Sequence, residues 1–318
     1  MKLIRFLHNL QPAHRGGVLT IGNFDGIHLG HQAMLAMLRD LAEQHATHAI
    51  LMSFRPLPHE YFRPQDTPSR LMNLREKINA LRAIDHSPDY LLLSRFDDAL
   101  AGLSAEDFIN SILVEQLAVK AVAVGDDFRF GAGRRGDIKL LREAGGKYGF
   151  EVVALSTHKV DNMRVSSTRI REALLQDDLE AAERMLGRPY AIEGRVAHGD
   201  KRGRTIGFPT ANIHLHRPAT ALDGVYAVQL YTGEAADGWV NGIANIGKRP
   251  TVNGTRKQLE VHLFDFDRDI YGRHVCIRFL HKVRDEKKFE SFEALKQQIQ
   301  QDCEMTKRYF QQHAEAPQ

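Results

Sequence analysis

The sequence predicts an α/β domain, with a parallel sheet covered by helices on both faces, followed by a small antiparallel β-barrel with a C-terminal helix. Two patterns predict this fold class. In the first half, short apolar runs alternate with segments of helical periodicity, as in strands joined by crossover helices. In the second half, turn residues separate β-like runs of regular spacing. The 318 residues, 43% of them hydrophobic, suffice for two cores.

The first half begins its alternation with the apolar run of residues 17–23. A helix is expected over residues 31–43, because apolar side chains recur there on one face, namely Met34, Leu35, Leu38 and Leu41. Further strands are expected at residues 48–54, 90–96, 121–127 and 151–157, and further helices at residues 75–84, 104–117 and 140–149. Such sheets bind ligands at the carboxyl ends of the strands, where the strand order reverses.

The character of the sequence changes after residue 166. Two helices are expected over residues 167–176 and 178–186, and Gly187 and Pro189 then end the helical pattern. We therefore divide the chain into an N-terminal domain, residues 1–186, and a C-terminal domain, residues 187–318. The β-runs of the second domain lie at residues 191–199, 208–215, 224–231, 238–247, 258–266 and 274–280. A final amphipathic helix, carrying Phe292, Leu295 and Ile299, is expected to pack against the barrel.

The composition argues against a nucleic-acid or membrane partner. The 43 basic and 40 acidic residues leave a net charge of only +3, too small for a field that attracts nucleic acid. Arg5, His8 and Asn9 interrupt the N-terminal segment, and no later apolar run approaches a membrane span. Cys276 and Cys303 lie far apart and form no disulfide framework, which suits a reducing compartment. We expect a cytoplasmic protein.

Residues 20–35, TIGNFDGIHLGHQAML, predict a phosphate site at the end of the first strand. Gly22 and Gly26 permit a tight turn and a close approach of the backbone to a ligand. A helix that begins near Leu29 would aim its free amide groups at an anion. His28 and His31, on the first turn, would donate hydrogen bonds to phosphoryl oxygens and stabilise the charge that develops when a bond to phosphorus is exchanged.

Two simpler interpretations of the histidine pair stay open. Histidines three residues apart can share a metal ion, but zinc needs a third ligand, and beyond Asp25 the neighbourhood is apolar. The pair can also be an incidental feature of a helix start, since His45 and His48 repeat the spacing nearby.

Several longer motifs follow one another in a specific order. GNFDGIHLGH, residues 22–31, resembles the HxGH signature of nucleotidyltransferases. The others are VGDDFRFG at residues 124–131, VSSTRIR at 165–171, GRTIGFPTAN at 203–212, NIGKRPT at 245–251 and LEVHLFDF at 259–266. Together they resemble the family of bifunctional bacterial riboflavin kinase/FMN adenylyltransferases, also called FAD synthetases. The resemblance spans both halves and implies a Rossmann-like nucleotidyltransferase domain followed by a β-barrel riboflavin kinase domain.

The resemblance implies two consecutive Mg²⁺-dependent transfers. Riboflavin and ATP would give FMN and ADP, and FMN with a second ATP would give FAD and pyrophosphate. Riboflavin, FMN, FAD and ATP are therefore the implied partners, and no particular protein partner is indicated. Both modules carry their chemical residues, so we expect both to be active rather than one alone.

The resemblance assigns residues to adenylyl transfer. His28 and His31 would be catalytic. ATP would contact Gly22, Asn23, Phe24, Asp25 and Gly30. Three further residues, Ser167, Thr168 and Arg171, match an SSTxxR element. There a helix N-terminus, hydroxyls and a guanidinium would hold the triphosphate and the departing pyrophosphate, although Ser-Ser-Thr is more often only a helix cap.

The resemblance assigns the flavin to the end of the strand expected at residues 121–127. The residues concerned are Gly125, Asp127, Phe128 and Phe130, and aromatic faces suit a flat isoalloxazine, although the two rings could instead belong to the core. The segment of residues 54–64 carries three prolines and is expected to be a loop over the active site. Arg55 stands in it where similar proteins usually carry an acidic residue.

The kinase residues implied by the resemblance lie on two strands of the second domain. Thr210 and Asn212, on one face of their strand, would coordinate Mg²⁺ with the ATP phosphates, oxygen ligands suiting that hard ion. Glu260 would be the general base that takes the proton of the riboflavin 5′-hydroxyl. The glycine-rich loop at Gly203, with its basic run of residues 201–204, would fold over the nucleotide; by itself this run is equally well a solvated turn.

A binding protein is the rival from another class. In it the first domain would sense a nucleotide and the barrel would grip single-stranded nucleic acid, which needs aromatic platforms along a basic groove. Asp265, Asp267 and Asp269 lie close together in the barrel, which disfavours such a groove.

Overall fold

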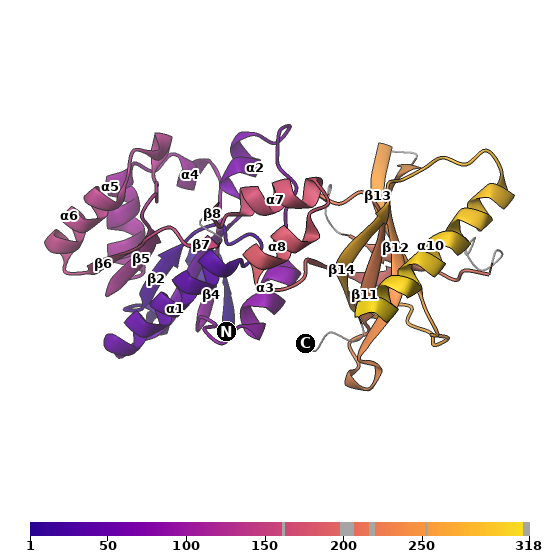
Figure 1. Cartoon of the computed structure of the whole chain (residues 1–318). Helices are drawn as coiled ribbons and strands as arrows, with labels where there is room; N and C mark the ends of the chain where they lie inside the picture. The colour runs from indigo at the N-terminus through magenta and orange to yellow at the C-terminus, as the bar shows by residue number, and fades with distance from the viewer. Residues whose placement is uncertain (161–162, 198–206, 216–219, 252–253, 314–318) are drawn as a thin grey trace. The chain divides into compact units, whose positions relative to one another are not determined.

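The computed structural model describes residues 1–160, 163–197, 207–215, 220–251 and 254–313. The chain divides into two compact units. The first consists of Met1–Pro68 and Lys77–Ser166, and the second of Ser69–Glu76 and Ser167–Gln318. Figure 1 follows the chain through both, from indigo to yellow.

The first unit is built on a parallel sheet, as predicted, with six strands where five were expected. Its strand order is β1-β4-β3-β2-β5-β6. The strands are β1 (Lys2–Arg5), β2 (Val18–Ile21), β3 (Ala49–Arg55), β4 (Tyr90–Arg95), β5 (Ala121–Gly125) and β6 (Glu151–Leu155). The chain runs from β2 to one side of the sheet and returns to the other side at β5, so the strand order reverses between β2 and β5. A ligand site is expected at the carboxyl ends of these two strands.

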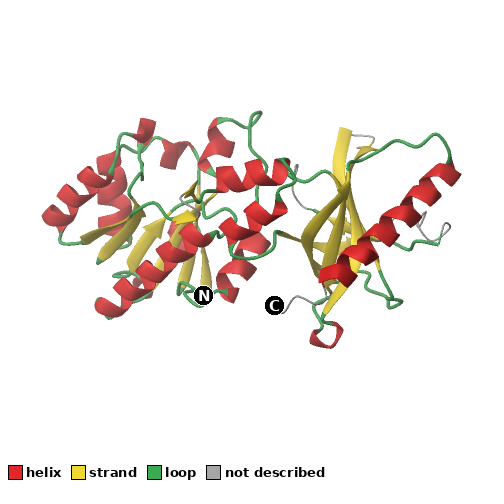
Figure 2. Ribbon diagram, in the orientation of Figure 1, coloured by secondary structure: helices red, strands yellow, loops and turns green. Residues whose placement is uncertain are grey.

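Two helices, α1 (Leu29–Gln44) and α6 (Ile138–Tyr148), pack against strands of this sheet (Figure 2). The other helices between its strands are α2 (Pro58–Phe62), α3 (Leu74–Ala83), α4 (Asp98–Ala101) and α5 (Ala105–Asp107). Short 3₁₀ turns lie at Leu7–Asn9, Pro12–His14 and Ala132–Arg134, and a two-stranded ribbon joins β7 (Lys159–Val160) to β8 (Met163–Arg164).

Two local features differ from the expectation. The edge strand β1 was not foreseen, because its four residues give too short an apolar pattern. The helix expected over residues 104–117 starts as α5, where Ser104 Oγ accepts the Asp107 N–H at 2.9 Å, and continues as a π-helix over Phe108–Gln116. The wider π-helical turn keeps Phe108, Ile109 and Ile112 buried against the sheet.

The second unit is a closed antiparallel barrel of order β10-β13-β12-β11-β14-β9, which confirms the predicted barrel. Its strands are β9 (Ala191–Ala197), β10 (Ala211–His214), β11 (Gly224–Tyr231), β12 (Trp239–Thr251), β13 (Gly254–Leu263) and β14 (His274–Arg284). A 3₁₀ turn lies at Ala235–Asp237. The helix α10 (Phe292–His313) packs against the barrel through Ile299, Cys303 and Phe310. Phe292, expected in that contact, is instead 55% exposed at the helix start.

Two helices before the barrel share its core. They are α7 (Ser167–Leu175) and α8 (Leu179–Leu186). Ile170, Leu174 and Leu186 are buried in one cluster with barrel residues such as Ile192 and Phe279. In the described ranges, none of the helices has the length and apolar character to cross a membrane.

Candidate active sites

The loop after β2 has an unusual backbone. Gly22 still pairs with β3, its N–H donating to Met52 O at 3.1 Å. Gly26 then takes a φ of 94°, but Phe24 and Ile27 also adopt positive φ, 46° and 44°. Residues other than glycine rarely adopt this left-handed conformation, which costs about 1–3 kcal/mol per residue. Residues that do adopt it concentrate at functional sites. The turn therefore depends on two strained residues besides the predicted glycine.

His28 and His31 lie together at the start of α1. His28 is the N-cap residue, not part of the first turn as expected, and its Nδ1 accepts the His31 N–H at 3.2 Å. Because Nδ1 accepts, the neutral His28 ring carries its proton on Nε2. The two imidazoles stack with centroids 3.5 Å apart, and Phe24 stacks on His31 at 4.6 Å. The rings of Phe24, His31 and His28 thus form one continuous stack.

Two more residues of the predicted ATP set, Asp25 and Gly30, lie close to the histidine pair in sequence. Asp25 is buried. Gly30 lies in the first turn of α1, where a Cβ would come within 3.3 Å of the His28 ring, a tight contact that the ring would have to shift to relieve. In the ranges the structure describes, no three His, Cys, Asp or Glu side chains are grouped to hold a metal, so nothing there supports the zinc interpretation of the histidine pair.

A cavity of about 690 Å³ lies at the carboxyl ends of the strands. Its size is within the range of about 300–1,000 Å³ usual for small-molecule sites. Gly22 and Asn23 line it after β2, and Asp127, Phe128 and Phe130 line it after β5. The structure therefore brings part of the predicted ATP loop and most of the predicted flavin set to one cavity.

The Phe128 and Phe130 rings lie 5.6 Å apart, nearly parallel. Phe130 is buried against Phe108, so it belongs to the core and to the cavity wall at once. Gly125 ends β5 and is not among the lining residues. The carboxylate of Asp127 contacts the Arg164 guanidinium.

The opposite wall of the cavity was missed by sequence reasoning. Phe54 is the last residue but one of β3 and Phe96 follows β4, with ring centroids 5.6 Å apart, and the ring centroid of Phe62 lies 5.7 Å from that of Phe96. The proline-rich segment expected as a loop forms the short helix α2, which has Pro58 at its first position and lines the cavity. Arg55 is exposed and is not a lining residue. The sequence signal that could have indicated this wall is the aromatic residue at the end of an apolar run, as at Phe54 and Phe96.

Three arginines add positive charge to the cavity: Arg63, Arg129 and Arg134. Arg129 pairs with Asp137 at 3.0 Å. The backbone N–H of Leu140 and then Arg129 hold the pKa of Asp137 below its usual range, so this carboxylate stays ionised and fixes the arginine. Aromatic walls and guanidinium groups together suit a flat ligand that carries an anionic group.

Ser167, Thr168 and Arg171 belong to the second unit. Ser167 begins α7, and Arg171 Nε donates to Ser69 O at 2.6 Å. The structure therefore groups the SSTxxR element with the barrel core and not with the parallel sheet.

The predicted kinase residues meet on neighbouring strands of the barrel. Asn212 on β10 pairs directly with Glu260 on β13, so their side chains share one face. Gln258 Nε2 donates to Asn212 Oδ1, and His262 Nδ1 lies 2.8 Å from Pro209 O. Alternate residues of β13 thus hold the FPTAN segment in register.

Thr210 precedes β10, which begins at Ala211, three residues later than the run expected at residues 208–215. It lines a pocket of about 90 Å³ together with Phe266 and Tyr271. This volume is too small for a flavin, compared with about 300 Å³ for the smallest usual ligand sites. Gly203 and the basic run of residues 201–204 lie outside the described residues.

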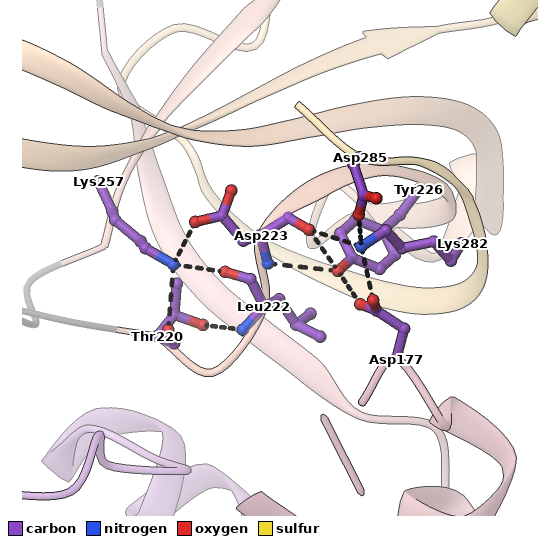
Figure 3. Close-up of polar contacts among 8 residues, drawn as sticks. All are labelled: Asp177, Thr220, Leu222, Asp223, Tyr226, Lys257, Lys282 and Asp285. Atoms are coloured by element: carbon purple, nitrogen blue, oxygen red, sulfur yellow. Dashed lines mark hydrogen bonds and ion pairs between the residues drawn. The ribbon is translucent and has the colours of Figure 1, made fainter. Parts of the chain in front are cut away.

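A polar cluster connects the turn between α7 and α8 to the barrel (Figure 3). Asp177 accepts from Tyr226 Oη and from Lys282 Nζ, both at 2.6 Å. Lys282 also donates to Asp223 O at 3.0 Å and pairs with Asp285 at 2.7 Å. Burial, and then the bond to Asp177, raise the pKa of Tyr226, so the phenol remains a donor.

Lys257, on β13, extends this polar cluster (Figure 3). Its Nζ donates to Leu222 O at 2.8 Å and Thr220 O at 3.3 Å and pairs with the Asp223 carboxylate at 2.9 Å. The segment before β11 is therefore fixed to β13, the strand of Glu260.

Two sequence families match the chain. The FAD synthetase family matches residues 10–169, and the riboflavin kinase family matches residues 186–310. The chain is 50% identical to the bifunctional riboflavin kinase/FMN adenylyltransferase of Escherichia coli K12 over 312 residues, 98% of both chains. It is 49% identical to the Haemophilus influenzae protein of the same name, over 98% of this chain and 99% of the relative.

Among solved structures, the chain is similar to the crystal structure of a macrolide-efflux protein from Streptococcus pneumoniae. The TM-score is 0.80 at 30% identity, and the match covers 96% of this chain and 99% of the other. The two-part architecture is thus shared over nearly the whole length.

Proposed function

The chain belongs to the family of bifunctional riboflavin kinase/FMN adenylyltransferases, and from this premise we propose which of its residues carry out each reaction. Membership confirms the resemblance seen in the motifs. The chain transfers the γ-phosphate of ATP to riboflavin, giving FMN and ADP, and then the adenylyl group of a second ATP to FMN, giving FAD and pyrophosphate.

The two reactions need different groups, since the attacking oxygens differ. In the first, a hydroxyl attacks phosphorus and must lose its proton to a base. In the second, the FMN phosphate is already largely ionised near pH 7, because the second pKa of a phosphomonoester is about 6. That site needs donors and cations that stabilise added negative charge and needs no base.

Adenylyl transfer is assigned to the loop after β2 and the 690 Å³ cavity. ATP contacts Gly22, Asn23, Phe24, Asp25 and Gly30, and its triphosphate and the departing pyrophosphate are held by Ser167, Thr168 and Arg171. His28, through Nε2–H, and His31 donate to oxygens on the phosphorus under attack. The flavin ring is assigned to Phe128 and Phe130, with Asp127 and Gly125 beside them. The observation that carries this assignment is the cavity itself, where the ATP loop, aromatic walls and arginines meet.

Riboflavin phosphorylation is assigned to the pair Asn212 and Glu260 and to Thr210. Glu260 takes the proton of the 5′-hydroxyl as its oxygen attacks the γ-phosphorus. The hydroxyl of Thr210 and the amide oxygen of Asn212 are hard oxygen donors that fit Mg²⁺, and they would hold it. When bound, the ion neutralises charge on the ATP phosphates. Support comes from the register, which sets Asn212 opposite Glu260.

The adenylyltransferase is assigned to residues 1–186 and the kinase to residues 187–318. The riboflavin kinase match, which begins at residue 186, supports the start of the second domain, whereas helices α7 and α8, which lie between the two matches, share the core of the barrel. We place the protein in the cytoplasm because Cys276 and Cys303 are free thiols, as is usual in a reducing compartment.

Two variants assayed in separate half-reactions test the assignments. Glu260→Gln should slow riboflavin phosphorylation by about 10²–10⁴-fold and leave FMN adenylylation intact. His31→Ala should slow FAD formation from FMN by about 10²–10³-fold and spare phosphorylation. Flavin products are separated by chromatography, with Glu304→Gln and His45→Ala, both away from the sites, as matched controls. Equal loss of both reactions in a folded His31→Ala protein would argue for a shared site and against these assignments.

A further inference from the structure

Lys77 is a buried lysine that contacts the loop after β2. It lies in the first turn of α3 and is only 5% exposed. Its Nζ donates to the carbonyl oxygen of Asn23 at 2.6 Å and to Ser53 Oγ at 3.2 Å, and Ser53 Oγ donates to the same carbonyl at 3.3 Å. Burial and a helix N-terminus both disfavour a cation. The hydrogen bonds to the loop therefore offset part of the cost of burying this cation.

The contact fixes the direction of a neighbouring backbone donor. The Asn23 carbonyl and the Phe24 N–H form one planar trans peptide group and point in opposite directions. Since the carbonyl points to Lys77 and Ser53, the N–H of Phe24 points away from them. Within the part of the chain that the structure describes, this N–H makes no hydrogen bond. Next to a ligand-sized cavity that Asn23 lines, such a donor suits an anion.

The same contact holds a strained residue in place. Phe24 has a φ of 46° and persists there only if its surroundings fix it. On one side its peptide is fixed by Lys77 and Ser53, and on the other its ring stacks on His31. Without the lysine, rotation of the peptide would relieve the strain, turn the Phe24 N–H inward and disturb the ring beneath His31.

We propose that Lys77 is a positioning residue for adenylyl transfer, which orients the Asn23–Phe24 peptide so that the Phe24 N–H meets a phosphate oxygen of ATP. Its ammonium group also polarises that peptide from the carbonyl end, which strengthens the N–H as a donor. Lys77 acts through the loop and does not touch the substrate. The inference rests on the proposed function, in which this loop binds ATP.

The test compares Lys77→Met, which keeps the length of the side chain and removes its donors, with Ser53→Ala and with the control Arg82→Met. Arg82 is an exposed cation in the last turn of the same helix. Lys77→Met should lower kcat for FAD formation by about 10–10²-fold, as expected when a reacting group is displaced. Ser53→Ala should give a smaller decrease in the same direction, and Arg82→Met no change.

Two readouts separate positioning from general support of the fold. Riboflavin phosphorylation, carried by the second unit, is measured in the same preparations and should not change. FMN binding, followed by flavin fluorescence, should keep the wild-type stoichiometry and affinity, because the aromatic walls of the cavity are intact. Loss of FMN binding in proportion to the rate would show a structural role and overturn the proposal.

The remaining outcomes distinguish an error in the role of Lys77 from an error in the assignment of the site. Wild-type kcat in Lys77→Met, with His31→Ala selectively impaired, would refute the role of Lys77 while the proposed function stands. Wild-type FAD formation in both variants would refute the assignment of adenylyl transfer to the loop after β2, on which the role of Lys77 rests. If Lys77→Met does not fold, Ser53→Ala carries the test: a reduced kcat with normal FMN binding supports the proposal, and an unchanged kcat refutes it.

Discussion

Replacing Asp177 should destabilise the second unit, and the structure sets the size of the effect. Asp177→Ala removes two charge-assisted hydrogen bonds, each worth about 1.5–3 kcal/mol at most. In the variant, the Tyr226 hydroxyl retains its hydrogen bond to Asp223 O at 2.9 Å, and Lys282 retains its contacts with Asp223 O and Asp285. Neither polar group is therefore left without a partner. The Asp177 side chain is also 32% exposed. We therefore expect a loss of about 2 kcal/mol, below the ~3–5 kcal/mol of a fully buried unpaired charge.

The same lysine provides the control. Asp285 pairs with Lys282 at 2.7 Å but is 91% exposed, so Asp285→Ala should cause no measurable change. Urea unfolding is followed by the fluorescence of Trp239, the only tryptophan of the chain, which lies in β12 and reports on the barrel. For a unit of this size, about 2 kcal/mol corresponds to a decrease in Tm of roughly 4–8 °C. Equal midpoints for Asp177→Ala and Asp285→Ala would refute the reasoning, since they would show that burial adds nothing to this pair.

Three further predictions concern other parts of the chain. The pKa of Asp137 is lower in the folded than in the unfolded protein, chiefly because of the Leu140 N–H. The stability that the ionised carboxylate gives to the fold is therefore present above the unfolded pKa of about 4 and is lost as the pH falls through the lowered folded pKa. Asp137→Asn should flatten the decrease in Tm between pH 5 and pH 2.5. Phe62→Ala should raise KM for FMN without changing Tm, because this cavity residue is 63% exposed, and an unchanged KM would remove Phe62 from the flavin site. Burial raises the pKa of Cys276 to about 12 and of Cys303 to about 11, so iodoacetamide at pH 8 should label neither in the native protein; rapid labelling detected by mass spectrometry would contradict this.

The fold was largely predictable because its signals are local. Alternating apolar runs and helical periods located five of the six parallel strands, and the turn residues located the barrel strands. Periodicity shows that a helix has an apolar face, but not which neighbour that face contacts. Helices α7 and α8 follow the parallel sheet in sequence, yet Ile170 and Leu174 are buried in the core of the barrel.

The candidate sites were predictable only where one motif carries them. GNFDGIHLGH and FPTAN are continuous, and the structure orders them as compact loops and strands. The second wall of the cavity comes from Phe54, Phe62 and Phe96, three isolated aromatic residues that no spacing connects. The role of Lys77 could not be predicted from the sequence either, because its partner Asn23 lies 54 residues away. The sequence of the helix that carries Lys77 has the pattern of an ordinary amphipathic helix.

The segment Ser69–Glu76, which belongs to the second unit although the first unit flanks it on both sides, constrains the order of folding during synthesis. Glu76 accepts the N–H of Glu193, 117 residues further along, and Leu71 is buried against the barrel and its two helices. At about 5–20 residues per second, a ribosome needs roughly 6–23 s to make that stretch. During this time the remaining strands of the parallel sheet are made, whereas the barrel that buries Leu71 is not yet available. The first-made piece of the second unit therefore has to wait, inside the first unit's sequence, for the rest of its own core.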